Sequence, residues 1–99
     1  MRYDVKVTVI KKSYHSDLIT AYNLTSSAPC DKFALGDTFF ITGKTPWDTP
    51  KGFCGWAWAD LQKMVWGMAR GGPDRFVSCC TDGLRPVTFL LERLEALDD

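Results

Sequence analysis

The sequence predicts an α+β fold: a small, mostly antiparallel sheet of about four strands, one main amphipathic helix and one short helix. Three observations lead to this prediction. The N-terminal residues alternate between apolar and polar, a central stretch has helical periodicity, and an Asp-Gly pair separates two strand-like runs near the C-terminus. The chain has 99 residues, of which 45% are hydrophobic, and this size and composition predict a single domain, residues 1–99, with one core.

The first predicted strand runs from Tyr3 to Ile10. Val5, Val7 and Val9 alternate there with polar residues. Successive side chains of a strand point to opposite faces, so the three valines are expected on one buried face.

A short helix and a second strand are predicted next. Ser16 or Asp17 can cap a helix over residues 17–24, and the turn-forming letters "TSSAP" then end it. The aromatic and β-branched residues from Thr38 to Thr42 favour a strand. Residues 43–52, "GKTPWDTPKG", are expected to form a loop because they hold two prolines and two glycines.

The main helix is predicted from Cys54 to Met68. At about 100° per residue, its apolar side chains fall within an arc of about 120°, which is typical of a helix packed on a sheet. The residues in this arc are Cys54, Ala57, Trp58, Leu61, Met64, Val65 and Met68. The letters "RGGP" then end the helix, with Gly71 or Gly72 available as a left-handed cap.

Two further strands are predicted over "RFVSCC", residues 75–80, and "RPVTFLLERL", residues 85–94. Thr81, Asp82 and Gly83 join them, and Asp-Gly is typical of a tight hairpin. The predicted order is strand, helix, strand, helix, strand, strand.

Composition argues against several partners. Twelve Lys and Arg balance twelve Asp and Glu, so the chain lacks the excess positive charge that binds nucleic acid. No apolar run approaches the ~20 residues of a membrane span, and the N-terminal letters do not resemble a signal peptide. A soluble, cytoplasmic protein is expected. Thiols stay reduced in that compartment, so the four cysteines are read first as free thiols or metal ligands.

The cysteines suggest a thiol site. Cys54 is expected in the first turn of the main helix, where backbone N–H groups and the helix dipole favour a thiolate. Cys79 and Cys80 are adjacent on a strand, so alternation places them on opposite faces unless a bulge turns both the same way. A disulfide between these neighbours would be strained and easily reduced. An inert, buried Cys54 is the competing interpretation.

Metal binding is the other use of clustered thiols. Cys30, Cys54, Cys79 and Cys80, with His15 in reserve, offer soft ligands to a transition metal such as zinc, iron or copper. The chain has no C-x-x-C pair, which argues against a standard zinc site.

Four further residues are candidates for the same site. Asp82 and Arg85 flank the expected turn, where an arginine oriented by a carboxylate can hold an anionic group of a substrate. Trp56 and Trp58 are candidate walls for a small-molecule ligand. The competing interpretations are an ordinary turn for the charged pair and packing for the tryptophans.

The segments "GFCGWAWADL" and "CCTDGLRPVTF" resemble an uncharacterised family of small bacterial and archaeal proteins, many of them from anaerobes. Similarity also runs through "VKVTVIKK" and "PCDKFALGDTF", so it covers nearly the whole chain. The resemblance implies no activity. The positions that match its pattern are Cys30, Cys54, Trp56, Trp58, Cys79, Cys80, Asp82, Gly83, Arg85 and Pro86.

Two functional hypotheses follow. The first is a cysteine-rich site for thiol-dependent redox chemistry or soft-metal binding, with Cys54 as the most nucleophilic thiol and Cys79 or Cys80 as the second. The alternative is a non-enzymatic binding or accessory module, expected to be a homodimer, whose cysteines only pack. Whether the protein is an enzyme stays open.

Overall fold

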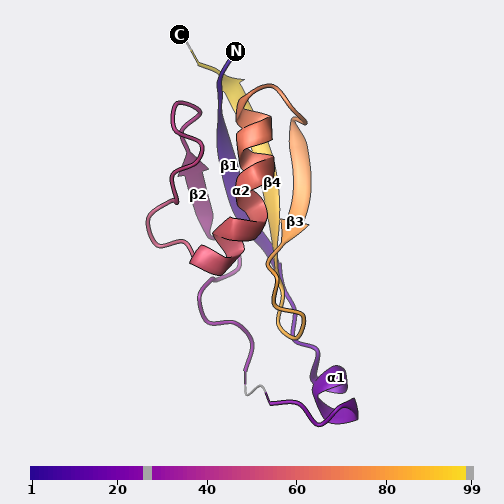
Figure 1. Cartoon of the computed structure of the whole chain (residues 1–99). Coiled ribbons are helices and arrows are strands. Elements are labelled where there is room, and N and C mark those ends of the chain that lie inside the picture. Colours follow the sequence, from indigo (N-terminus) through magenta and orange to yellow (C-terminus); the bar gives the residue numbers. More distant parts are fainter. Residues whose placement is uncertain (26–27, 98–99) are drawn as a thin grey trace.

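The computed structural model describes residues 1–25 and 28–97 and confirms the α+β fold. One four-stranded antiparallel sheet carries a long helix on one face, and a short helix lies apart from it (Figure 1). The elements are β1 (Tyr3–Lys12), α1 (Ser16–Ala21), β2 (Thr38–Ile41), α2 (Gly55–Ala69), β3 (Arg75–Cys79) and β4 (Val87–Ala96). The strand order is β2-β1-β4-β3, which places the two longest strands in the centre of the sheet.

The core lies between α2 and one face of the sheet. Alternation along β1 buries Val5, Val7 and Val9, as predicted, and alternation along β4 buries Phe89 and its apolar neighbours. The helix contributes the face that the sequence predicts. Its buried residues are Ala57, Trp58, Leu61, Val65, Met68 and Ala69.

Four phenylalanine rings close the core at the end where α2 begins. Phe33, Phe39, Phe53 and Phe89 come from separate segments, and their ring centroids lie 4.7 to 5.9 Å apart in the contacting pairs. Most of these pairs meet edge to face, the arrangement that the ring quadrupole favours. The cluster fixes the segment before β2 against the start of α2.

The end of α2 confirms the predicted glycine cap. Gly71 has φ +99°, and its N–H donates to the carbonyl of Met68, while the N–H of Gly72 donates to that of Gly67 at 2.8 Å. These two hydrogen bonds form a Schellman motif, which places Gly71 in the left-handed region that glycine adopts without steric strain.

In the described part of the chain, no helix covers the other face of the sheet (Figure 1). Phe40, on β2, is 64% exposed there, and Val77, on β3, is also exposed. Their register partners on the central strands are Lys6 and Leu90.

The segment that carries α1 extends away from the sheet, so the longest dimension of the molecule is 53 Å against 23 and 20 Å for the others (Figure 1). The radius of gyration is 15.0 Å, compared with about 13 Å for a compact domain of this length. Two backbone bonds tie the base of this arm to the β3–β4 loop: the N–H of Ser13 donates to Pro86, and the N–H of His15 donates to Leu84.

Two predictions for the short helix differ from the structure, and the strand over Tyr3–Ile10 continues to Lys12. Helix α1 ends at Ala21 instead of residue 24, because the chain leaves the helix and Asn23 takes a positive φ of 53°. Its N-cap is His15, without a side-chain hydrogen bond, and not Ser16 or Asp17.

In residues 1–25 and 28–97, no helix has the length and hydrophobicity needed to span a bilayer.

Candidate functional site

A pocket of about 270 Å³ lies where the start of α2 meets the β3–β4 loop and the segment before β2. Its walls are mostly apolar. It brings together side chains from all three segments, among them most of the residues that the sequence singles out. These are Cys30, Cys54, Trp56, Cys80, Asp82 and Arg85.

Cys54 lies at the N-cap of α2, one position before the first turn in which the sequence places it. A tight turn puts it there: the N–H of Phe53 donates to the carbonyl of Pro50 at 3.1 Å, and Gly52 has φ +80°. A positive φ at the third residue of such a turn is the requirement of a type II turn and favours glycine. The turn sends Phe53 into the core and leaves the half-buried Cys54 facing the pocket.

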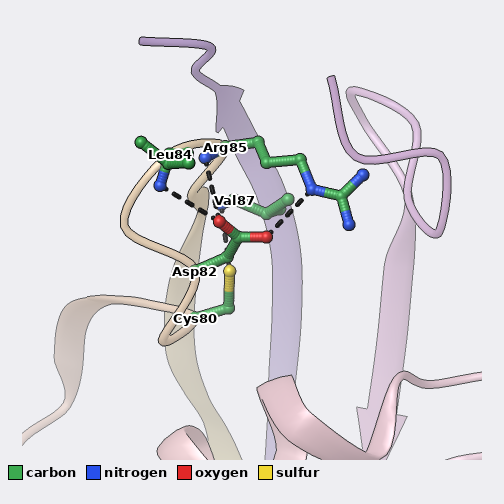
Figure 2. A network of polar contacts seen from close by, with 5 residues as sticks. All are labelled: Cys80, Asp82, Leu84, Arg85 and Val87. Atoms are coloured by element: carbon green, nitrogen blue, oxygen red, sulfur yellow. Dashed lines mark hydrogen bonds and ion pairs between the residues drawn. The ribbon is translucent and has the colours of Figure 1, made fainter. Parts of the chain in front are cut away.

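Cys80 reaches the same pocket from the end of β3. Alternation separates the two neighbouring thiols, because Cys80 packs against the core while Cys79 is exposed. The backbone N–H of Val87 donates to the sulfur of Cys80 at 3.3 Å, which holds this thiol at the base of the loop (Figure 2).

Cys30 enters from the segment that precedes β2. Phe33 holds this segment in place, since its ring is buried among the rings of Phe39, Phe53 and Phe89. Cys30 is half-buried and packs against the core cluster. Three free thiols from three distant parts of the chain therefore line one pocket.

Asp82 organises the loop that forms the rim (Figure 2). One of its oxygens accepts hydrogen bonds from the backbone N–H groups of Leu84 and Arg85, at 3.0 and 3.1 Å, and the other accepts a hydrogen bond from Nε of Arg85 at 2.9 Å. The Asp82 carboxylate, and not a strand partner, accepts the hydrogen bonds of the Leu84 and Arg85 N–H groups. For this reason the connection between the two strands is longer than the three residues predicted. Residues 80–86 separate β3 from β4.

The pair is charged over the whole physiological range. Desolvation raises the pKa of Asp82, but the hydrogen bond from the Arg85 side chain, those from the two backbone N–H groups and the guanidinium charge together lower it below its ordinary value of 3.8. The hydrogen bond to Asp82 is also the main reason that the pKa of Arg85 is raised.

This network predicts the titration of Asp82. Its folded-state pKa lies below the unfolded value of 3.8, so the pair contributes stability above that pH and loses it as the pH falls through the lowered pKa. We expect the carbon-13 signal of the Asp82 carboxyl group to titrate below pH 3.8. Arg85→Gln should move this midpoint upward, and an unmoved midpoint would contradict the assigned cause.

Two predicted site residues do not join the pocket. Cys79 is exposed on the opposite side of β3, because no bulge reverses the alternation between it and Cys80. Trp58 is 5% exposed and lies in the core beside Phe53, since it belongs to the helix face that meets the sheet. Its indole N–H is buried and has no hydrogen-bond partner among the residues that the structure describes. Trp56, in contrast, is 74% exposed and forms part of the pocket wall.

The four cysteines are not gathered as metal ligands. In the part of the chain that the structure describes, no three His, Cys, Asp or Glu side chains lie close enough together to hold a metal ion. The separation of Cys79 from Cys80 by strand alternation is one reason. His15 lies at the base of the arm, next to α1.

Four residues that were not predicted for the site also line the pocket: Lys32, Phe33, Ala57 and Thr81. For Phe33 a signal was present, since it is an aromatic residue three positions after Cys30 in a mostly polar stretch. Thr81 follows Cys80 directly, and Lys32 is an exposed cation whose position no sequence pattern indicated.

Comparison with known proteins gives no match: no family model, no curated protein and no solved structure is similar to this chain. The resemblance carried by "GFCGWAWADL" and "CCTDGLRPVTF" therefore stays a prediction, and the function must be argued from the pocket itself.

Proposed function

We propose that the pocket is a site of thiol–disulfide exchange with a small-molecule disulfide. Cys54 attacks first, Cys80 is the second thiol, and Arg85 holds the substrate at the rim. The observation that carries this proposal is that three free thiols, from three segments of the chain, line one pocket together with an oriented arginine.

The position of Cys54 supports its role as the attacking thiol. It precedes the first turn of a 15-residue helix that has no acidic residue in that turn and no side-chain cap at its N-terminus. The unpaired backbone N–H groups and the positive end of the helix dipole at such a position favour attack by a thiolate. Cys54 is also half-buried, so the pocket is its route to a small substrate.

The proposed reaction balances within the thiols and the disulfide. Cys54 loses its proton to solvent, and its sulfur attacks one sulfur of the substrate, which forms a mixed disulfide and releases one thiolate. Cys80 then loses its proton to solvent, and its sulfur attacks the Cys54 sulfur, which breaks the mixed disulfide and releases the second half of the substrate as a thiolate. Two protein thiols are oxidised to one disulfide, and one substrate disulfide is reduced to two thiols, each of which takes up a proton.

The test follows each cysteine separately. Reduced protein is treated with hydroxyethyl disulfide, a neutral reagent, quenched with acid at intervals, and mapped by peptide mass spectrometry. We expect Cys54 to react several-fold faster than the more exposed Cys79, and a Cys54–Cys80 disulfide to follow.

Single variants make this order of events visible. Cys80→Ser should trap the mixed disulfide on Cys54, and Cys54→Ser should abolish the fast phase. Cys79→Ser is the matched control, because it removes the neighbouring thiol outside the pocket, and both steps should persist in it.

One outcome would favour the alternative instead. If Cys30, Cys54 and Cys80 react only after the protein is unfolded, they have a packing role and the proposed exchange is wrong. The uncovered sheet face with its exposed Phe40 and Val77 would then support a binding module that associates as a homodimer. Sedimentation at several protein concentrations would measure that association.

A further inference from the structure

The charged rim of the pocket points to the class of disulfide that it takes. Building on the exchange reaction proposed above, we propose that the substrate carries a carboxylate, and that Arg85 binds this group with both terminal nitrogens of its guanidinium. Arg85 thereby selects the substrate by charge, while the thiols carry out the reaction.

The geometry of Arg85 leaves this binding edge open. Asp82 accepts a hydrogen bond from Nε at 2.9 Å, and the two terminal nitrogens of the guanidinium lie beyond Nε, farther from the Asp82 carboxylate (Figure 2). Among the described residues, no hydrogen bond from either terminal nitrogen to a protein acceptor is found. A planar pair of donors held in one orientation matches the two oxygens of a carboxylate.

The pocket favours an anion more through the fixed orientation of the Arg85 guanidinium than through the net charge of its lining residues. Asp82, Lys32 and Arg85 are the charged residues that line the pocket, and Asp82 already pairs with Arg85. The charge of Asp31, outside the lining, also acts on Arg85 and offsets part of the positive potential. The start of α2, which has no acidic residue in its first turn, adds positive potential at the pocket wall.

The remainder of the pocket suits a short apolar chain. Phe33, Trp56 and Ala57 form its walls together with the thiols. The pocket volume of about 270 Å³ lies just below the range of about 300 to 1,000 Å³ that is typical of ligand sites. A small disulfide with a few methylene groups between sulfur and carboxylate fits this combination.

Three disulfide reagents of similar length and different charge separate the effect of substrate charge from the intrinsic reactivity of each reagent. Dithiodipropionate carries carboxylates, hydroxyethyl disulfide is neutral, and cystamine carries amines. For each reagent, the rate of reaction at Cys54 is divided by the rate at Cys79 in the same molecule. This ratio cancels the intrinsic reactivity of the reagent, because Cys79 lies outside the pocket.

At low salt we expect the ratio for dithiodipropionate to exceed that for hydroxyethyl disulfide by about tenfold, and the ratio for cystamine to be the lowest. Added salt should weaken this order because it screens the charges. Arg85→Gln should bring the ratio for dithiodipropionate close to that for the neutral reagent, and Arg85→Lys should give an intermediate value. Arg75→Gln is the matched control: Arg75 is exposed on β3 and pairs with Glu92, so the order should persist in that variant.

Asp82→Asn distinguishes orientation from charge. The amide oxygen can still accept the backbone N–H groups of Leu84 and Arg85, but the variant loses the acceptor of Nε and one negative charge. If net charge alone attracted the substrate, the preference for dithiodipropionate would rise. We expect it to fall several-fold, because the guanidinium is no longer held in place.

The outcomes separate the two proposals. Equal ratios for all three reagents, with Cys54 still reacting rapidly, would overturn the carboxylate preference and leave thiol exchange intact. A strong preference that survives Arg85→Gln would also overturn it, because Arg85 would not be the binding group. A Cys54 that reacts with none of the three reagents would instead sink the exchange reaction itself.

Discussion

Phe89→Ala should lower the free energy of unfolding by about 3 to 5 kcal/mol, the range for deleting a buried aromatic ring. Phe89 is 0% exposed on β4, and its ring centroid lies 5.1 Å from that of Phe33 and 5.5 Å from that of Phe53. Its removal leaves a cavity under the phenylalanine cluster. A domain of this length has a total stability of about 5 to 15 kcal/mol, so the variant should retain only part of its fold at 25 °C or melt far below the wild type.

The matched control is Phe40→Ala. Phe40 lies on the same sheet but on its uncovered face, where it is 64% exposed, so its removal should cost about 1 kcal/mol or less. Urea unfolding followed by tryptophan fluorescence measures both variants. Equal losses of stability in the two would show that the buried cluster is not the centre of the core.

The same variant links the core to the pocket. Phe33 holds the segment that carries Cys30, and Phe33 in turn packs against Phe89. Under conditions in which Phe89→Ala is still folded, Cys30 should become more reactive toward a neutral alkylating reagent, whereas the already exposed Cys79 should change little.

The elements whose signal is local were predictable from the sequence. The valines of β1 fixed the buried face of the first strand, and the apolar arc of α2 fixed which side of the helix meets the sheet. The two glycines after α2 likewise indicated its end correctly. Each of these features depends on the spacing of residues within one short segment.

The features that depend on distant partners were not predictable. Which of Cys79 and Cys80 faces the pocket depends on which face of β3 is covered by α2, and the sequence of β3 alone does not contain that information. The loop of residues 80–86, in contrast, has a local cause: Asp82 accepts hydrogen bonds from the backbone N–H groups two and three residues later, and Pro86 has no N–H to extend the pairing. The burial of Trp58 was also predictable, because the periodicity that defined the helix placed it in the apolar arc, and its assignment as a ligand wall was wrong.

Gly43→Ala should lower the free energy of unfolding by about 3 kcal/mol, because a methyl group has no room at this position. A Cβ built on Gly43 would conflict with the carbonyl oxygen of Tyr3 and would lie 2.7 and 2.9 Å from the carbonyl carbon and the nitrogen of that residue. These are backbone atoms of β1, which cannot rotate away as a side chain would. Two hydrogen bonds of 2.8 Å also hold Gly43: its N–H donates to Asp4, and its carbonyl accepts from Arg70.

Relief of the conflict therefore requires the end of β2 to move away from β1, which breaks the bond to the Asp4 carboxylate and the tie to Arg70 at the end of α2. Gly67→Ala is the matched control, since a Cβ at this exposed helix position meets nothing within 4 Å. Alanine has the higher helix propensity, so this variant should gain about 0.5 to 1 kcal/mol. Denaturant unfolding of both variants, followed by tryptophan fluorescence, gives the comparison. A Gly43→Ala protein as stable as the wild type would show that β1 and the residues after β2 lie farther apart than the structure places them.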